Sequence, residues 1–145
     1  DMSYLNEMLK ELGKEELIPL TRNVVSNCFE AMKPRLVDYS QGESIKIKFP
    51  VQDIYLNPAG AMQGGFIAAA FDNAFGLLCF LVSDKHALSL DLSTNFLKPI
   101  LNKEELIVAV YLKHKGNTLI NMWGEAFNKQ GQLAATAVTN MIFLK

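Results

Sequence analysis

The sequence contains little of what marks several classes of protein. Its 145 residues include only two cysteines, Cys28 and Cys79, so it is not a small domain held by a network of disulfides. Its 14 Lys and Arg are balanced by 15 Asp and Glu, which leaves no excess of positive charge for binding a nucleic acid. Nine Gly and five Pro are too few for a collagen-like or low-complexity chain. These absences favour an ordinary globular protein.

Several enzyme motifs and targeting signals are also missing. No G-x-S-x-G, H-E-x-x-H, C-x-x-C or G-x-x-x-x-G-K pattern occurs, which excludes the common serine hydrolase, metal and phosphate-loop signatures. The first residues are acidic and amphipathic instead of basic and then apolar, so we expect no secretory signal. The two cysteines have no metal or redox spacing, and we expect them as reduced thiols in a cytoplasmic protein.

The spacing of apolar residues divides the chain. Half of the residues are hydrophobic, and the length is near that of one average domain, so we expect a single domain over 1–145. The first 34 residues have helical periodicity and predict two short amphipathic helices, one ending at Gly13 and one closed by Pro34. Their apolar faces consist of Leu5, Leu9 and Leu12 in the first helix, and of Leu20, Val24, Cys28, Phe29 and Met32 in the second.

After Pro34 the apolar spacing changes from helical to alternating. Ile45, Ile47 and Phe49 alternate with lysines and predict a strand with one wet face. Four more strands are predicted, joined by hairpin-length turns, within 88–92, 105–115, 118–132 and 133–144. With one long helix before these four strands, the order predicts an α+β fold in which a mostly antiparallel sheet wraps around a buried helix.

The longest apolar run, 64–82, reads GGFIAAAFDNAFGLLCFLV and is almost long enough to cross a bilayer. Asp72 lies in its middle, where an ionised carboxylate is most costly in lipid, and no cluster of Lys or Arg flanks the run. We therefore expect a helix buried in the core of the protein and no membrane span.

One face of this helix combines its only acid with its smallest residues. At about 100° per residue, that face consists of Gly65, Ala68, Ala69, Asp72, Gly76 and Cys79. Asp72 is then either a paired carboxylate that fixes the packing or a functional acid, because an unpaired buried carboxylate is costly. Gly64 and Gly65 leave backbone N–H groups at the positive end of the helix, which can hold an oxyanion or simply form a turn.

The pattern Asn57-Pro-Ala-Gly60-Ala-Met-Gln63-Gly64-Gly65, followed by Asp72, resembles the signature of hotdog-fold acyl-CoA thioesterases of the phenylacetate-degradation type. That family has an Asn, a Gly turn, His-Gly-Gly and an Asp at the same spacings. The segment LSLDLSTNFLKPI also resembles the family's second strand, with its basic residue before Pro. The resemblance covers about 35–145 and implies a hotdog core there, with 1–34 as an N-terminal helical extension.

One position departs from the family pattern. Gln63 stands where the family usually has His, and a glutamine forms hydrogen bonds but does not exchange a proton near neutral pH. If the His only orients the substrate or the leaving thiolate, Gln63 can replace it at a reduced rate. If the His protonates the leaving group, the replacement removes that step.

The resemblance implies a role for each site residue. Asp72 is implied as the general base or nucleophile toward a thioester carbonyl, and the Gly64 N–H as the oxyanion donor. Asn57 is implied as a second donor or as the group that positions water, and Ser89 as a hydroxyl near the attacking water. The implied substrate contacts are Gly65, Asn73, Met62 and Lys98, with Lys113 and Lys115 as further candidates for the phosphates of coenzyme A. No metal or bound cofactor is implied, because coenzyme A is part of the substrate.

The family's sites form between two subunits, so the resemblance implies a homodimer or a dimer of dimers. It implies an acyl-CoA thioesterase that hydrolyses a small or medium acyl-CoA to the free acid and coenzyme A, with no nucleic-acid partner. One alternative is a non-catalytic protein that binds acyl groups or coenzyme A, and Gln63 favours it. A second alternative is a hydratase or dehydratase, and a third is an interaction module with Asp72 in its interface, because fold alone does not decide function.

Overall fold

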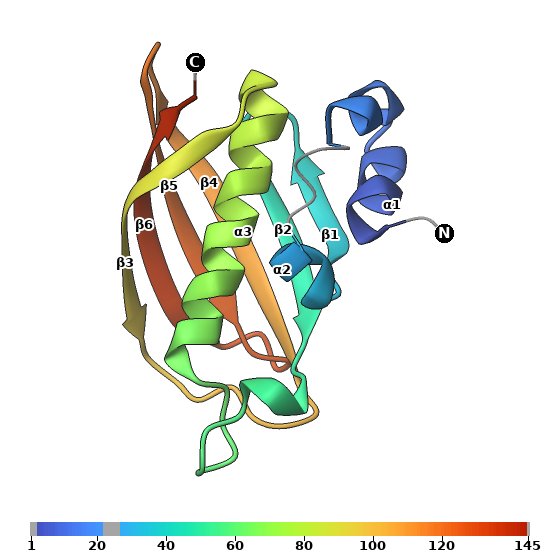
Figure 1. Ribbon diagram of the computed structural model, residues 1–145. Helices are drawn as coiled ribbons and strands as arrows, with labels where there is room; N and C mark the ends of the chain where they lie inside the picture. Colours follow the sequence, from blue (N-terminus) through green and yellow to red (C-terminus); the bar gives the residue numbers. More distant parts are fainter. Residues whose placement is uncertain (1–2, 22–26, 145) are drawn as a thin grey trace.

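The computed structural model describes residues 3–21 and 27–144, which form a curved sheet with one long helix in its concave face (Figure 1). The helical elements are α1 (Tyr4–Glu11), the 3-10 helix η1 (Glu15–Thr21), α2 (Asn27–Ala31), the 3-10 helix η2 (Asp53–Tyr55) and α3 (Gly64–Ser83). The strands are β1 (Arg35–Ser40), β2 (Ser44–Pro50), β3 (Ala87–Phe96), β4 (Glu105–Lys115), β5 (Leu119–Phe127) and β6 (Leu133–Phe143).

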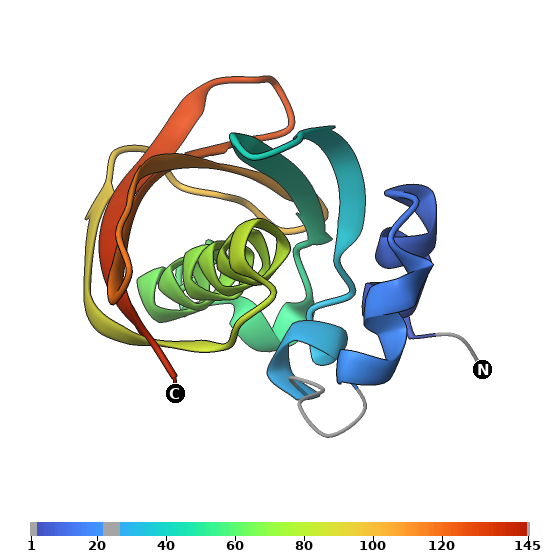
Figure 2. The ribbon, with the colours of Figure 1, turned by 90° about the horizontal axis from the view of Figure 1, so that it is seen from above.

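The six strands form one sheet in the order β1-β2-β4-β5-β6-β3, and every neighbouring pair is antiparallel. β3 follows α3 directly in the chain but lies at one edge of the sheet, and β1 forms the other edge. Seen from above, the sheet curls around α3, and α1 lies outside the β1 edge (Figure 2). The predicted sheet around a central helix is confirmed, and it is the arrangement of a hotdog fold.

α3 is held in the sheet by its bulky side chains. Phe71, Phe75 and Leu78 are fully buried. β5 passes so close to the helix that a Cβ atom at Gly124 would lie 2.8 Å from the ring of Phe71, so this strand position accepts only a glycine without rearrangement. Among the described residues α3 is the one helix long and apolar enough to span a membrane, and 56% of its most apolar window is buried. It is the core helix of the fold.

The small-residue face of α3 is partly accessible, as predicted, except at its C-terminal end. Asp72 and Gly76 are half-buried, and Gly65 is exposed. Cys79, on the same face, is only 1% exposed, and the residues from 77 to 81 are buried in succession.

β1 is a strand that the alternating pattern did not indicate, because the predicted sheet began near residue 45. The register of β1 on β2 shifts between Leu36 and Asp38, which breaks the alternation of the strand. As a result, Leu36 and Tyr39 both pack against the core although they are three residues apart.

The N-terminal segment matches the prediction for its first helix and departs from it for the second. α1 ends before Gly13, which has a φ of +70° and terminates the helix. The second predicted helix is divided into η1 and α2, and Val24 lies outside the described residues. Pro19 lies inside η1, and its missing N–H and fixed ring disfavour an α-helix there. Phe29 is buried, whereas Leu20 is 51% exposed.

Candidate active site

Asp72 and Ser89 form the clearest polar contact on the concave side of the sheet. Asp72 lies in the middle of α3 and is half-buried, while Ser89 lies near the start of the edge strand β3. The Oγ atom of Ser89 donates a hydrogen bond to Oδ1 of Asp72 at 2.6 Å. A hydroxyl donor at this distance fixes the orientation of a carboxylate and stabilises its charge. The two residues predicted to act at the attacking water are therefore neighbours.

A cavity of about 310 Å³ lies beside this pair. Asp72, Asn73 and Ser89 line it, so it contains three of the predicted site residues. Its remaining wall is largely apolar and includes side chains from α3, β3, β6 and the N-terminal segment. A mostly apolar cavity with a few convergent polar groups is the usual form of a small-molecule site.

The start of α3 supplies two backbone donors. The N–H groups of Phe66 and Ile67 both donate to the Gln63 carbonyl, at 3.0 and 3.3 Å. The N–H groups of Gly64 and Gly65 have no acceptor among residues 3–21 and 27–144. Such groups at the positive end of a helix dipole favour an anion or a developing oxyanion.

The loop before α3 is held by Asn57. The Asn57 Oδ1 atom accepts hydrogen bonds from the N–H groups of Ala59 and Ala61, at 3.0 and 3.1 Å. The Asn57 N–H in turn donates to the Ala61 carbonyl at 2.7 Å. Gly60 completes the turn with a φ of +81°, a conformation that side chains disfavour. The oxygen of the Asn57 amide is thus used within the loop, and its Nδ2 atom is the end left to act as a donor.

A second groove, of about 430 Å³, lies at the start of α3. Asn57, Met62, Gly64 and Lys98 all line it, which brings together four further residues of the predicted site. The Phe96 ring borders Gly64 so closely that a Cβ atom there would lie 2.9 Å from it. Lys98 is exposed, so the groove has a positive charge at its rim.

Gln63 is the N-cap residue of α3, but its side chain makes no capping hydrogen bond and is exposed to solvent. Its backbone N–H donates to the Tyr55 carbonyl at 2.7 Å. Burial raises the pKa of the Tyr55 phenol, an effect opposed by the hydrogen bond from Gln52. Tyr55 therefore remains a neutral phenol that supports the loop. Because the Gln63 side chain is exposed and caps no backbone group, it is available to a ligand.

The structure separates the predicted residues into two groups within one chain. Gly64 and Asp72 are eight residues apart on α3, which corresponds to about 12 Å along the helix axis. An attacking water would lie about 3 Å from the Asp72 carboxylate, and the oxyanion would lie about 3 Å from the Gly64 nitrogen. One thioester carbonyl therefore cannot meet both groups of the same chain.

The edge strand β3 carries an unusual number of exposed apolar side chains. Leu88 and Leu90 are each 57% exposed, and Phe96 is 53% exposed. β3 pairs with β6 on one side only, so its other edge offers free backbone groups. A long, apolar and unpaired edge of this kind is a pairing surface for another strand.

The other two candidate lysines lie away from both groups. Lys115 Nζ donates to the Val82 carbonyl at 2.9 Å, at the end of α3. Lys113 lies over the Trp123 ring, 4.9 Å from its centroid. Trp123 is 54% exposed. Among the described residues, no group of three or more His, Cys, Asp or Glu is arranged to hold a metal ion.

The sequence left two roles open for the N-terminal helices: they cover the mouth of the pocket, or they only pack on the sheet. Leu5, Thr21 and Phe29 line the cavity beside Asp72. The sequence did not single out these three residues, because amphipathic spacing contains no information about which part of the core a segment meets.

The fold matches several solved structures, and part of the sequence matches a family model. A protein of Streptococcus mutans UA159, smu.793, solved bound to acetyl CoA, is 26% identical with a TM-score of 0.70, over 75% of this chain and 86% of that chain. The Escherichia coli PaaI protein from the phenylacetic acid degradation operon is 18% identical, with a TM-score of 0.78 over 88% of this chain and 91% of that chain. A hypothetical thioesterase from Streptococcus pneumoniae TIGR4, solved with coenzyme A, is 21% identical, with a TM-score of 0.72 over 77% of this chain and 85% of that chain.

The last two proteins are too distant in sequence to show more than the shared fold. No curated protein matches the chain. Residues 59–135 match the family model of the thioesterase superfamily. This range contains α3, the strands β3, β4 and β5, and the start of β6. That match covers more than half of the sequence, and the chain therefore belongs to the thioesterase superfamily.

Proposed function

We propose that the protein is an acyl-CoA thioesterase that hydrolyses a small or medium acyl-CoA to the free acid and coenzyme A. The observation that carries this proposal is the Asp72 carboxylate, held by Ser89 at 2.6 Å beside an apolar cavity in a chain of the thioesterase superfamily. The solved relatives with acetyl CoA or coenzyme A support the same class of ligand.

In this proposal Asp72 is the general base. Its carboxylate takes a proton from a water molecule whose oxygen forms a bond with the thioester carbonyl carbon. The carbonyl oxygen becomes an oxyanion that accepts the Gly64 N–H, with the Asn57 Nδ2 as a second donor. When the carbon–sulfur bond breaks, the electron pair leaves with the coenzyme A sulfur, which then acquires a proton. Direct attack by the Asp72 carboxylate, through an anhydride, requires the same contacts.

The smallest active unit in this proposal is a homodimer. The Gly64 and Asp72 groups of one chain are too far apart to act on one carbonyl, so Asp72 of one subunit must meet the helix start of another. Pairing of two β3 edges would cover Leu88 and Leu90 and satisfy the free edge of each sheet. A dimer of such dimers is compatible with the same site.

Gln63 and Lys98 have supporting roles in the proposed reaction. The Gln63 amide has no capping role on α3 and is free to donate a hydrogen bond to the departing sulfur or the carbonyl. Lys98 lies at the rim of the groove that contains Gly64, and in this proposal its charge meets a phosphate of coenzyme A. A thioester is an activated acyl group, so a base and two donors suffice, and the proposal includes no metal or resident cofactor.

The first test is thiol release from a panel of acyl-CoAs by the purified protein beside an Asp72→Asn variant. The amide keeps the shape of the side chain and removes its charge, so we expect turnover to fall by about a hundred-fold or more. If the parent releases no thiol but binds acyl-CoA, the protein is a non-catalytic acyl-CoA-binding protein. If the variant keeps full turnover, Asp72 is not the base.

A second test addresses the two-subunit site. Asn57→Asp retains an oxygen for the N–H groups of Ala59 and Ala61 but replaces the proposed amide donor. We expect this variant and Asp72→Asn to be weakly active alone. When the two are co-expressed, half of the dimers are mixed and one of their two sites is intact, so activity should recover to about a quarter of the parent. No recovery in verified mixed dimers would place the whole site in one chain.

A further inference from the structure

The N-terminal segment forms one wall of the cavity beside Asp72. Leu5 comes from α1 and Phe29 from α2, and they lie across the cavity from side chains of α3. Neither residue has a role in the proposed chemistry, and the match to the thioesterase superfamily begins only at residue 59. A wall of this kind can select the substrate without taking part in the reaction.

We propose that this cavity holds the acyl group of the substrate and that Leu5 and Phe29 limit its length to a medium chain. This inference rests on the proposed function, because it names the substrate class of the same site. Asp72 and Ser89 lie at the reacting end of the cavity, and the apolar walls contact the rest of the acyl group.

The dimensions of the cavity support a medium acyl chain. From Asp72 the lining follows α3 to Phe80, about 12 Å along the helix axis. His86 stacks on Phe80, with 5.2 Å between the ring centroids, and lines the same end. An extended chain of about eight carbons is shorter than this lining of about 12 Å, whereas one of about sixteen carbons is longer.

Gly76 is the open position in the α3 wall. It lies one turn beyond Asp72 and lines the cavity. A Cβ atom at Gly76 would meet no heavy atom within 4 Å, so the space above the helix backbone there belongs to the cavity. Glycine weakens the interior of a helix relative to alanine, and this position gives the acyl chain room to pass.

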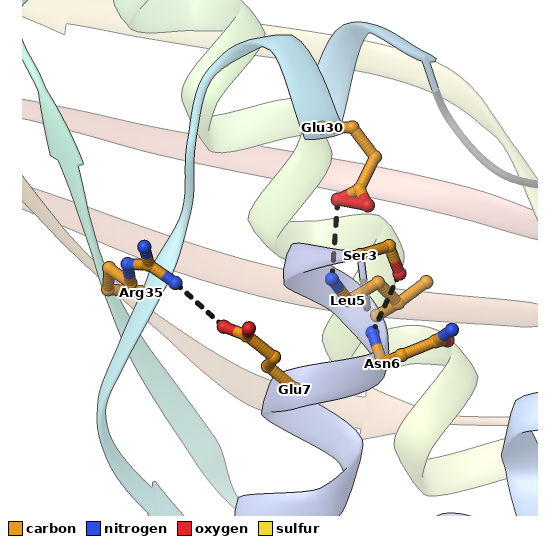
Figure 3. A network of polar contacts seen from close by, with 6 residues as sticks. All are labelled: Ser3, Leu5, Asn6, Glu7, Glu30 and Arg35. Carbon is orange, nitrogen blue, oxygen red and sulfur yellow. Dashed lines mark hydrogen bonds and ion pairs between the residues drawn. The ribbon is translucent and has the colours of Figure 1, made fainter. Parts of the chain in front are cut away.

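A hydrogen bond joins the two N-terminal wall residues into one unit. The Leu5 N–H donates to the Oε2 atom of Glu30, the neighbour of Phe29, at 3.3 Å (Figure 3). The Ser3 Oγ caps the same helix by accepting from the Asn6 N–H at 3.1 Å. A carboxylate at the first turn of a helix is also favoured by the helix dipole. Glu30 is therefore a positioning residue for the wall.

α1 is also fixed to the sheet, so the wall is a permanent part of the fold. Arg35 of β1 contacts Glu7 at 2.8 Å, as Figure 3 shows, and its guanidinium lies 4.4 Å from the centre of the Tyr4 ring. On its inner side, Met8 and Leu9 are fully buried. Because the exposed ion pair contributes little, burial of these two side chains is the main attachment.

The first test compares Leu5, which lies in α1, with Leu12, which caps the C-terminus of α1. Leu5 and Leu12 are both partly buried against the core, but only Leu5 lines the cavity. Thiol release is measured with butanoyl-, octanoyl- and hexadecanoyl-CoA. In the parent, each buried methylene should raise kcat/KM by roughly four-fold until the cavity is full. We therefore expect octanoyl-CoA to have the highest kcat/KM of the three. Leu5→Ala should raise the ratio of kcat/KM for hexadecanoyl-CoA to that for octanoyl-CoA by at least five-fold. Leu12→Ala should leave this ratio unchanged.

A second variant must move the preference in the opposite direction. Gly76→Leu adds a side chain to the cavity from a position where a Cβ atom meets no heavy atom within 4 Å. It should lower kcat/KM for octanoyl-CoA relative to butanoyl-CoA by at least ten-fold. Glu30→Gln weakens the contact with the Leu5 N–H and should broaden the preference while kcat on butanoyl-CoA stays within two-fold. If Leu5→Ala and Leu12→Ala have the same profile, or if Gly76→Leu keeps the profile of the parent, the acyl group does not occupy this cavity.

Calorimetric binding separates this inference from the proposed function. Octanoyl-CoA should bind the Asp72→Asn variant more tightly than coenzyme A does, and Gly76→Leu in that background should abolish the difference. This result would support the acyl cavity even if the parent released no thiol. Equal affinities for octanoyl-CoA and coenzyme A would overturn the inference even in a protein that hydrolyses thioesters.

Discussion

The Oγ atom of Ser89 lies 2.6 Å from Oδ1 of Asp72 and donates a hydrogen bond to it, which joins the edge strand β3 to the middle of α3. Oδ2, the other oxygen of the carboxylate, has no hydrogen-bond partner in the part of the chain that the structure describes. The contact therefore fixes one oxygen and leaves the second to accept a proton from water.

Ser89→Ala should reduce kcat by about ten-fold or more with little change in KM, because the carboxylate loses the donor that orients it. Ser89→Thr retains the hydroxyl and should recover most of the activity. Ser83→Ala is the control, since the Ser83 Oγ bonds backbone groups near the end of α3 and the Cys79 side chain, and does not contact Asp72. Equal losses for Ser83→Ala and Ser89→Ala in steady-state kinetics would contradict this role.

Gln63→His should introduce a group that exchanges protons at the start of α3. The Gln63 side chain is exposed and caps no backbone group, so the free energy of unfolding should change by less than about 0.5 kcal/mol. We expect kcat to rise and to acquire a pH dependence near the ordinary histidine pKa, about 6.5. A pH–rate profile identical to that of the parent would show that this position only orients the substrate.

Gly124→Ala should destabilise the fold, because its Cβ atom would lie 2.8 Å from the buried Phe71 ring and 3.0 Å from Phe75. Overpacking of this kind costs about 1–3 kcal/mol. Gly76→Ala is the control, since its Cβ atom meets open space and should stabilise the helix by about 0.5–1 kcal/mol. Urea denaturation measures both, and the prediction fails if the two variants change the midpoint in the same direction.

Stability should fall at alkaline pH. Burial raises the pKa of the Cys79 thiol above its ordinary 9.0, and burial likewise raises the pKa of Tyr55 and Tyr111 above 10.0, with Glu125 adding to the effect at Tyr111. The folded state therefore retains protons that the unfolded state loses, so stability is complete below about pH 8 and decreases as the pH rises above it. Cys79→Ala should reduce the decrease in the free energy of unfolding between pH 8 and pH 10, about the range in which a thiol titrates. Denaturation curves recorded across this pH range measure it. An unchanged decrease would exclude Cys79 as a contributor.

Leu90→Lys should disrupt the proposed β3 pairing, because it places a charge on an apolar edge strand where leucine is 57% exposed. We expect light scattering to show a monomer, and thiol release to fall with it because the site needs two chains. Leu119→Lys is the control, since Leu119 is also exposed but β5 is an interior strand. A Leu90→Lys protein that remains a fully active dimer would place the subunit contact elsewhere.

Periodicity identified most elements because each depends on residues close together in the chain. The apolar run around Asp72 and the alternating strands after residue 87 are local patterns, and the structure contains both. β1 was missed because the register shift after Leu36 breaks its alternation. The second N-terminal helix was predicted as one element, whereas the structure has a 3-10 helix that contains Pro19 and the short helix α2.

The sequence by itself determined the fold class and the residue types of the site: a long apolar helix with one acid on its small face, preceded by a Gly-Gly start. Only the tertiary structure decided which of these groups meet. It brought Ser89 to Asp72, placed Gly64 in a separate groove, and gave the cavity a wall that includes Leu5 and Phe29. Local spacing specifies which face of an element is apolar, whereas the partners of that face depend on how distant segments pack together.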